Sequence, residues 1–208
     1  MSKHPSTLLG VFAAAALLAF VAPVYAQDSA AEQVPTVKDP IRFTAIAVQM
    51  SAGASGQVQI SVERWSTEEE RKALIALVGT ATDKPGGQDQ LLEALQNIKV
   101  RTGFIRLPNT MGWDLKYAYQ TKLEDGSRQI VIATDKPVSF LSAASNARAM
   151  DYPFSLIEMR FPAGKAKGEG KLLGRTSIST KDGKLALELY GTEATRLTSI
   201  TQKKSKKK

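Results

Sequence analysis

The chain has 208 residues, with 28 Lys and Arg against 20 Asp and Glu, one His, no Cys and 43% hydrophobic residues. This composition is typical of a globular protein of about one domain, and it excludes disordered, collagenous and disulfide-stapled chains. The single histidine is His4, which lies in the segment interpreted below as an export signal.

The first 26 residues have the features of a cleaved secretory signal peptide. Lys3 precedes an apolar run from Leu8 to Val21, the segment ends in Val24-Tyr25-Ala26, and it contains no acidic residue. A membrane-spanning helix needs about 18 or more consecutive apolar residues, and this run is shorter. We therefore predict cleavage before Gln27, a periplasmic or secreted location, and no transmembrane span after cleavage. Residues 27–40 have no periodic pattern and are expected to form a flexible leader.

Most of the net charge of +8 belongs to the C-terminal end of the chain. Without Lys3 and the five C-terminal lysines, 22 basic residues stand against 20 acidic ones, so the body of the chain is nearly neutral. A run of like charges buries nothing, so residues 203–208 are expected to form a disordered tail. The tail is either a solubilising end or a group that binds an anionic envelope surface through Lys203, Lys204, Lys206, Lys207 and Lys208. We expect no nucleic-acid partner, because only the tail is basic.

A single β domain is expected over residues 41–202, and it opens with a hairpin. Residues 41–50 have two fairly apolar faces, which is typical of a well-buried strand, and apolar and polar residues alternate more sharply from Gln57 to Glu63, after Gly53 and Gly56. Alternation with a period of two predicts two antiparallel strands.

Helical spacing then predicts a two-helix insert at about residues 66–98. A capping box is expected at its start, formed either by Ser66 with Glu69 or by Thr67 with Glu70. Gly79 is expected to end the first helix.

The clearest alternation in the chain runs from Trp113 to Leu123. It predicts one strand that carries Trp113, Tyr117 and Tyr119 on the same face. Asp125-Gly126 predicts a two-residue type I′ turn into a strand over residues 128–134, and this register places Tyr119 opposite Ile132.

Further strands are expected at residues 100–107, 154–161, 171–180, 184–190 and 195–200. Asp182-Gly183 predicts a hairpin turn that pairs Ile178 with Leu187. The fold is therefore mainly β, with about eight antiparallel strands that close as a lipocalin-like barrel or form a sandwich, plus the two-helix insert. Closure is expected because open sheet edges promote aggregation. The absence of strand-helix alternation argues against a parallel α/β fold.

Three short segments resemble those of an uncharacterised family of exported bacterial proteins. They are Glu63-Arg64-Trp65-Ser66, Asp151-Tyr152-Pro153-Phe154 and Tyr190-Gly191-Thr192-Glu193. The resemblance covers about residues 41–200. It implies no mechanism, because the family has no assigned activity.

The residue types of the mature chain remove most catalytic chemistry. With neither His nor Cys after cleavage, Ser-His-Asp and Cys-His nucleophiles, thiolate or imidazole zinc sites and His-ligated haem are impossible. A carboxylate pair that hydrolyses glycosides remains open, with Asp135, Asp151 and Glu158 as candidates, although such residues are more often turn formers. We therefore expect a protein that is not an enzyme and that uses no cofactor and no metal ion.

The aromatic face is the main indication of function. Trp113, Tyr117 and Tyr119 either line a barrel cavity for a small apolar or amphipathic ligand or simply fill the core. Arg148 and Tyr152, in the irregular segment 137–153, are the other candidate ligand-binding residues, placed at a barrel mouth. Arg148 forms either a gate or a local ion pair with Asp151.

We therefore predict an exported, non-enzymatic binding protein with a small apolar or amphipathic ligand in a β-barrel. The alternative is a structural or interaction protein of the cell envelope, with a filled core and a basic tail that contacts anionic surfaces.

Overall fold

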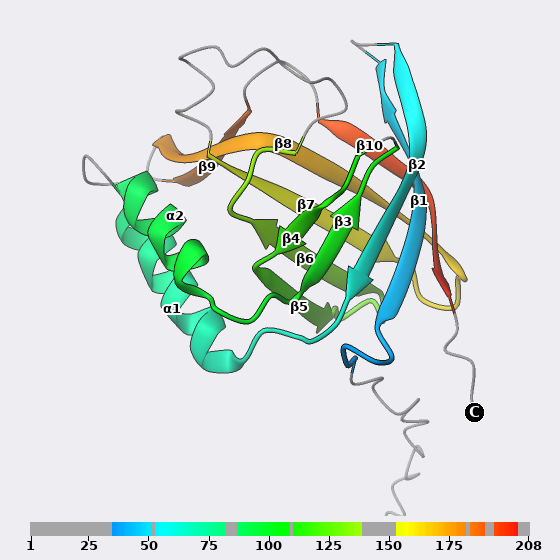
Figure 1. Ribbon diagram of the computed structural model, residues 1–208, viewed down its shortest axis with the longest axis horizontal. Helices are drawn as coiled ribbons and strands as arrows, with labels where there is room; N and C mark the ends of the chain where they lie inside the picture. The colour runs from blue at the N-terminus through cyan, green and yellow to red at the C-terminus, as the bar shows by residue number, and fades with distance from the viewer. Residues whose placement is uncertain are drawn as a thin grey trace, which may run out of the picture. The chain divides into compact units, whose positions relative to one another are not determined.

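The computed structural model describes residues 35–50, 53–81, 87–108, 110–138, 153–181, 184–189 and 194–203. Ten strands and two helices lie in this part of the chain (Figure 1). In chain order they are β1 (Ile41–Gln49), β2 (Ala54–Val62), α1 (Glu68–Ala81), α2 (Gly87–Asn97), β3 (Gly103–Arg106), β4 (Trp113–Leu115), β5 (Tyr117–Lys122), β6 (Arg128–Thr134), β7 (Phe154–Phe161), β8 (Lys167–Lys181), β9 (Lys184–Leu189) and β10 (Thr195–Lys203).

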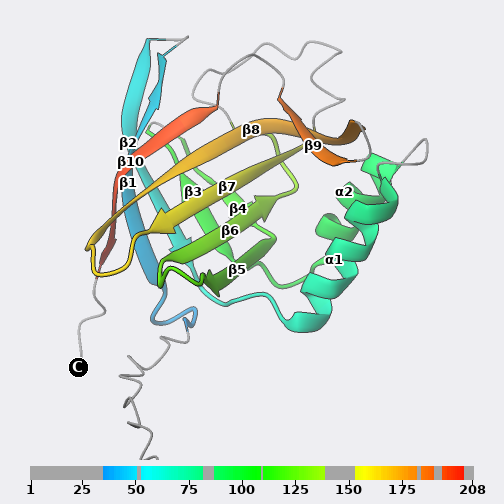
Figure 2. The same ribbon diagram turned by 180° about the vertical axis from the view of Figure 1, so that it is seen from behind.

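The strands form one antiparallel sheet. Nine of the described strands follow each other in the order β4-β3-β2-β1-β10-β8-β7-β6-β5, and β9 pairs with β8 beside this path. The sheet curves into a nearly closed barrel, which Figures 1 and 2 show from opposite sides. The prediction of a mainly β fold with about eight antiparallel strands and a two-helix insert is confirmed. Of the two predicted architectures, the chain adopts the barrel.

The barrel closes because one run of chain changes its neighbour part-way along. The first part of the run, β4, pairs with β3, and the second part, β5, pairs with β6. The change occurs at Lys116, whose backbone N–H donates to the carbonyl oxygen of Ala133 over 2.9 Å. The first and last strands of the sheet order are therefore consecutive in sequence.

The change of neighbour at Lys116 also reverses the faces of the strand. Leu115 and Ala118 are both fully buried in the cluster inside the barrel. They lie three positions apart, whereas strict alternation would place inward residues two apart, so Tyr117 and Tyr119 face outward. Predicting one face for Trp113, Tyr117 and Tyr119 was therefore wrong, because one added residue in a strand exchanges its two faces.

The β5–β6 hairpin has a longer turn than the sequence predicts. Tyr119 lies opposite Val131, not Ile132. The N–H of Leu123 donates to the carbonyl oxygen of Ser127, which encloses a three-residue turn, and Gly126 takes the left-handed conformation with φ of 74°. This arrangement is the usual one for three-residue hairpin turns.

The β8–β9 hairpin has the predicted register. Ile178 lies opposite Leu187, and the flanking pairs continue to Lys181 opposite Lys184. Here the Asp-Gly signal and the alternation of the two strands agree with the structure.

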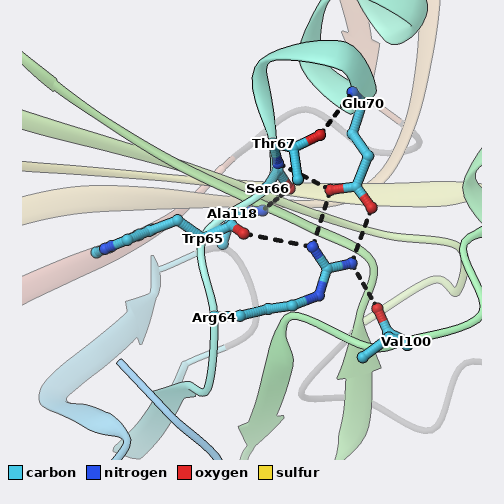
Figure 3. A network of polar contacts seen from close by, with 7 residues as sticks. All are labelled: Arg64, Trp65, Ser66, Thr67, Glu70, Val100 and Ala118. Carbon is cyan, nitrogen blue, oxygen red and sulfur yellow. Dashed lines mark hydrogen bonds and ion pairs between the residues drawn. The ribbon is translucent and has the colours of Figure 1, made fainter. Parts of the chain in front are cut away.

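Helix α1 begins with the capping box of Thr67 and Glu70, one of the two predicted boxes. The N–H of Thr67 donates to the Glu70 carboxylate over 3.0 Å, and the N–H of Glu70 donates to Thr67 Oγ1 over 3.2 Å. Arg64 donates to both carboxylate oxygens of Glu70, over 2.8 and 3.0 Å, and to the carbonyl oxygen of Val100 over 2.6 Å (Figure 3). This network connects the start of the helical insert to the chain segments at both of its ends.

The two helices cover part of the outer face of the sheet, where β5 and β7 begin and β6 ends (Figure 1). Leu91 and Leu95 of α2 are buried and pack with Phe154 in a cluster outside the barrel. Gly79 does not end α1, which continues to Ala81, so that part of the helix prediction was wrong. Packing of the apolar helix face stabilises the helix past an internal glycine.

A larger cluster fills the inside of the barrel. Its members are buried side chains from β1 to β8 and β10, including Phe43, Ile60 and Ile132. They alternate with outward residues along most of the strands, as in other barrels with a packed interior. In β10 the register shifts between Leu197 and Ile200, so these two interior residues lie three positions apart.

Several predicted boundaries shift. The strand predicted to start at residue 171 begins at Lys167, as β8. The strand predicted to start at residue 100 begins at Gly103. Residues 35–40, placed in the flexible leader, contain a turn in which the N–H of Thr36 donates to the carbonyl oxygen of Asp39. Lys203, predicted as the first residue of the tail, is the last residue of β10 and lies opposite Arg42. The predicted signal peptide lies outside the described residues.

Candidate binding site

The inner face of the barrel becomes polar at the end where β6 begins. Ile130 and Ile132 are fully buried inside the barrel, and Arg128 is the next inward position along β6. Gln202 is opposite the buried Phe43 and follows the buried Ile200 by two positions, so it also faces inward. A guanidinium and an amide therefore lie at this end of the barrel interior.

Arg128 makes neutral contacts only, among the partners that the structure describes. Its guanidinium donates to Oε1 of Gln202 over 2.7 Å and to Oε1 of Gln120 over 3.4 Å. The guanidinium carbon lies 4.5 Å from the ring centroid of Phe161. No described carboxylate lies within ion-pair distance of Arg128.

Burial lowers the pKa of Arg128 below its ordinary value, because desolvation penalises the charged form. Arginine nevertheless stays protonated in proteins at neutral pH. The barrel end thus holds a half-buried positive charge that an anion would compensate.

Arg128 opens into a pocket of about 440 Å³, here called the mouth pocket. Three segments of the chain form its wall. Gly126 and Arg128 lie around the start of β6, and Gln202 belongs to β10. The end of β7 and the turn after it contribute Phe161, Pro162, Ala163, Gly164, Lys165 and Ala166.

Turn chemistry positions the wall of the mouth pocket. The N–H of Lys165 donates to the carbonyl oxygen of Pro162 over 3.1 Å, and Gly164 takes a left-handed conformation with φ of 69°. A Cβ atom added to Gly126 would lie 3.4 Å from the Cβ of Ala163, so the turns after β5 and β7 are in contact. The pocket is therefore formed by ordered turns, and Lys165 adds a second positive charge to it.

The mouth pocket combines an apolar wall with two cations. Phe161, Pro162 and Ala163 supply apolar surface, while Arg128 offers a planar fork of donors that matches a carboxylate or phosphate. Pockets of roughly 300–1,000 Å³ with a few convergent polar groups are typical sites for small molecules. The arrangement is suited to an amphipathic anion.

The structure separates the three aromatic residues that the sequence placed together. Trp113 lies opposite Ile105 and packs against the interior cluster. It also lines a shallow pocket of about 200 Å³. Tyr117 and Tyr119 lie outside the barrel, with ring centroids 6.4 Å apart.

The two tyrosines belong to the helix-covered face. Tyr119 Oη donates to the Glu68 carboxylate over 2.6 Å, and the Arg71 guanidinium lies 4.7 Å from the Tyr119 ring centroid. Tyr117 packs against the cluster beneath the helices, and its burial raises its pKa. These contacts join α1 to β5 and leave the tyrosines away from the barrel interior.

Other predicted site residues fall mainly outside the described residues. Arg148 and Tyr152 do so, as do Lys204, Lys206, Lys207 and Lys208. Lys203 is an exposed residue of β10.

The comparisons with known proteins give no relative. No family model, curated protein or solved structure matches this chain. The resemblance to a family of exported bacterial proteins therefore stays a prediction, and the geometry of the barrel end is the basis for assigning a function. In the described part of the chain, no group of three or more His, Cys, Asp or Glu residues is placed to hold a metal ion. No described helix has both the length and the apolar character needed to cross a membrane.

Sequence reasoning missed Arg128, although the sequence carries a signal for it. Arg128, Ile130 and Ile132 share one face of a predicted strand, so a charged residue occupies a position of the inward series. A cation on the same face of a strand as core residues indicates where the barrel interior ends and solvent begins. The predicted ligand site was placed on β4 and β5 instead, because of their aromatic residues.

Trp65 is a second feature that the sequence did not resolve. Its side chain packs against the interior cluster, and its indole N–H is buried without a hydrogen-bond partner among the described residues. The neighbouring Ser66 exchanges two hydrogen bonds with the backbone of Ala118, so the segment after β2 contacts β5. A buried donor without an acceptor is a position where water or a ligand oxygen would bind.

Proposed function

We propose that this protein is an exported, non-enzymatic binding protein that holds a small amphipathic anion in the mouth pocket. The observation that carries the proposal is the half-buried Arg128 guanidinium, which faces a pocket of about 440 Å³ and contacts only neutral groups among the described residues.

An anionic head group is favoured over a neutral one by electrostatics. Arg128 is desolvated without a compensating charge, so a carboxylate or phosphate recovers part of the free energy that burial costs. Lys165 lies in the same wall and adds to the attraction. A cationic ligand would meet two like charges and be excluded.

The apolar part of the ligand packs against Phe161, Pro162 and Ala163. The barrel interior behind them is occupied by the packed cluster of Phe43 and its neighbours. The ligand is therefore bound at the end of the barrel, with only a short apolar portion enclosed.

Isothermal titration calorimetry with three octyl compounds tests the proposal. Octyl phosphate, octyl glucoside and octyltrimethylammonium share one chain and differ in head-group charge. We expect octyl phosphate to bind with a Kd below about 1 mM, at least about tenfold more tightly than the other two.

Two matched variants identify the site. Arg128→Met removes the buried charge and is expected to weaken octyl phosphate binding about tenfold or more, because a charge-assisted contact is lost. Arg196→Met removes an exposed charge from β10 and is expected to leave binding unchanged. Equal affinities of the two variants, or of the phosphate and the glucoside for the unchanged protein, would contradict the proposal.

The stability of Arg128→Met separates a binding role from a structural one. A desolvated cation without a counter-charge destabilises the folded state, so its replacement by a similar apolar chain should keep or raise the melting temperature. A large fall would assign Arg128 a structural role.

The filled interior favours a second candidate function, that of an envelope interaction protein without a small ligand. Its buried side chains form one continuous cluster, and Lys203 places the basic C-terminal sequence directly after β10. Deletion of residues 204–208 is then expected to reduce retention on anionic vesicles, and salt at about 0.5 M to release the intact protein. Identical partitioning of the two proteins at low ionic strength would reject a binding role for the tail.

A further inference from the structure

A second surface, separate from the mouth pocket, lies on the outer face of β2, β3 and β4. Its centre is Arg106, an exposed outward residue of β3 that lies opposite Gln59 of β2. Arg106 lines two neighbouring pockets, of about 250 and 200 Å³. One arginine residue therefore borders both pockets.

The charge of Arg106 is available to a ligand, unlike that of the nearby Arg101. Arg101 donates to both carboxylate oxygens of Glu63, over 2.9 and 3.0 Å, and to Asp114 over 2.9 Å, and these contacts raise its pKa. Arg106 has no ion pair with any described residue, and its guanidinium carbon lies 5.8 Å from the ring centroid of Phe104. Arg101 is shared between two carboxylates, and of the two arginines that line these pockets Arg106 is the one without a described carboxylate partner.

The two pockets differ in chemistry. The larger one is lined by the amide side chains of Gln57 and Gln59 together with Pro108 and Thr110. Amides offer both donors and acceptors, which suits the hydroxyl groups of a sugar. The smaller one is lined by the apolar residues Phe104, Met111 and Trp113 and also by the ion-paired Arg101 and Asp114, with Met111 98% exposed. Apolar and aromatic side chains suit the C–H face of a sugar ring.

The wall of this surface is held in place before any ligand binds. Thr110 Oγ1 donates to the carbonyl oxygen of Leu107 over 2.9 Å and accepts from the Leu107 N–H over 3.2 Å, which fixes the turn after β3. Gly112, with φ of 95°, lies so close to β3 that an added Cβ would be 2.7 Å from the carbonyl oxygen of Ile105. Preorganised sites lose less entropy on binding.

We propose that this outer face binds an acidic oligosaccharide, with its carboxylate on Arg106 and two successive sugar units in the two pockets. A bidentate guanidinium–carboxylate contact sets the register of the chain. The Gln57–Gln59 pocket then binds one sugar through hydroxyl groups, and the smaller pocket binds the next against Phe104 and Met111. This site does not depend on Arg128 or on the proposed amphipathic ligand.

Titration with trigalacturonate, against maltotriose as the neutral trisaccharide, tests this proposal. Trigalacturonate is expected to bind at least about tenfold more tightly than maltotriose. In a Trp65→Phe background the remaining tryptophan, Trp113, should report binding by a change in fluorescence, because it lines the smaller pocket.

Three variants assign the site. Arg106→Gln is expected to lower trigalacturonate affinity about tenfold or more, while Arg196→Gln, which removes an exposed charge from β10, leaves it unchanged. Arg128→Met should also leave it unchanged, which separates this site from the mouth pocket. Equal losses of affinity in Arg106→Gln and Arg196→Gln would show unspecific charge attraction and overturn the proposal. The absence of any binding at a trigalacturonate concentration of about 10 mM would also overturn it.

Discussion

Replacement of Glu70 by Gln tests how strongly the helical insert is connected to the barrel. Glu70 accepts two hydrogen bonds from Arg64 and one from the N–H of Thr67 (Figure 3). Glutamine has almost the same shape but no charge and only one acceptor oxygen. The charged bidentate contact with Arg64 is reduced to at most one neutral hydrogen bond, beside the bonds of Arg64 to two carbonyl oxygens.

The magnitude follows from the partial burial of the pair. Fully exposed ion pairs contribute about 0.2–1 kcal/mol, and breaking a fully buried pair costs about 3–5 kcal/mol. The side chains of Arg64 and Glu70 are 25% and 26% exposed. We therefore expect a loss of about 2 kcal/mol, between these limits, which for a domain of this size lowers the melting temperature by roughly 4–8 °C.

Glu69→Gln is the matched control. Glu69 lies in the same first turn of α1, so both variants lose the same favourable interaction with the helix dipole. Glu69 is not among the residues that contact Arg64, and its replacement should cost less than about 0.5 kcal/mol. Urea unfolding followed by circular dichroism measures both variants, and indistinguishable midpoints would refute the role assigned to the Arg64–Glu70 contact.

The effect of Glu70→Gln depends on pH in a defined direction. The hydrogen bond from Arg64 is the main cause that lowers the pKa of Glu70 below 4.5. A lowered folded-state pKa means that the carboxylate stabilises the protein fully above the unfolded value and loses this effect as the pH falls through the folded value. The difference between the two proteins should be complete at pH 7 and shrink below about pH 4.5.

Four further outcomes follow from burial, backbone geometry and sequence. Leu95→Ala opens a cavity beneath the helices and should cost about 3 kcal/mol in urea unfolding, and a loss below about 1 kcal/mol would mean that α2 does not pack as described. Gly170→Ala places a Cβ 2.2 Å from a backbone oxygen of β7 and should cost at least about 3 kcal/mol. Gly53→Ala meets no atom within 4 Å and should cost only about 1 kcal/mol for its left-handed backbone, so equal losses at the two glycines would contradict the close approach of β7 and β8. Intact-mass measurement of exported protein should give an N-terminus at Gln27, and a mass that includes Met1 would reject the signal-peptide prediction.

Short sequence patterns correctly predicted those features of the fold that depend on contacts between residues close together in the chain. The β8–β9 register followed from Asp182-Gly183 and the alternation around it, and Ile178 does lie opposite Leu187. The start of α1 followed from the spacing of Thr67 and Glu70. Both features depend on contacts between residues close in the chain.

The features that failed depend on distant strands. Whether the run through Lys116 stays one strand is decided by β3 on one side and β6 on the other, and no local pattern marks the change. The same change moved Tyr117 and Tyr119 to the outer face and removed them from the predicted barrel cavity. The candidate site was missed for a similar reason, because Arg128 and Gln202 meet only once β6 and β10 are placed.

The position of β10 between β1 and β8 sets the order in which this molecule is completed. Thr44 in β1 and Thr201 in β10 share a hydrogen bond of 2.8 Å across 157 residues of chain. While the chain is being synthesised from its N-terminus, the edges of β1 and β8 that pair with β10 therefore stay unpaired until β10 is in place. Pairings of such long sequence separation form slowly, on the order of milliseconds to seconds. Until β10 has paired with both strands, their open edges leave this protein vulnerable to edge-to-edge association.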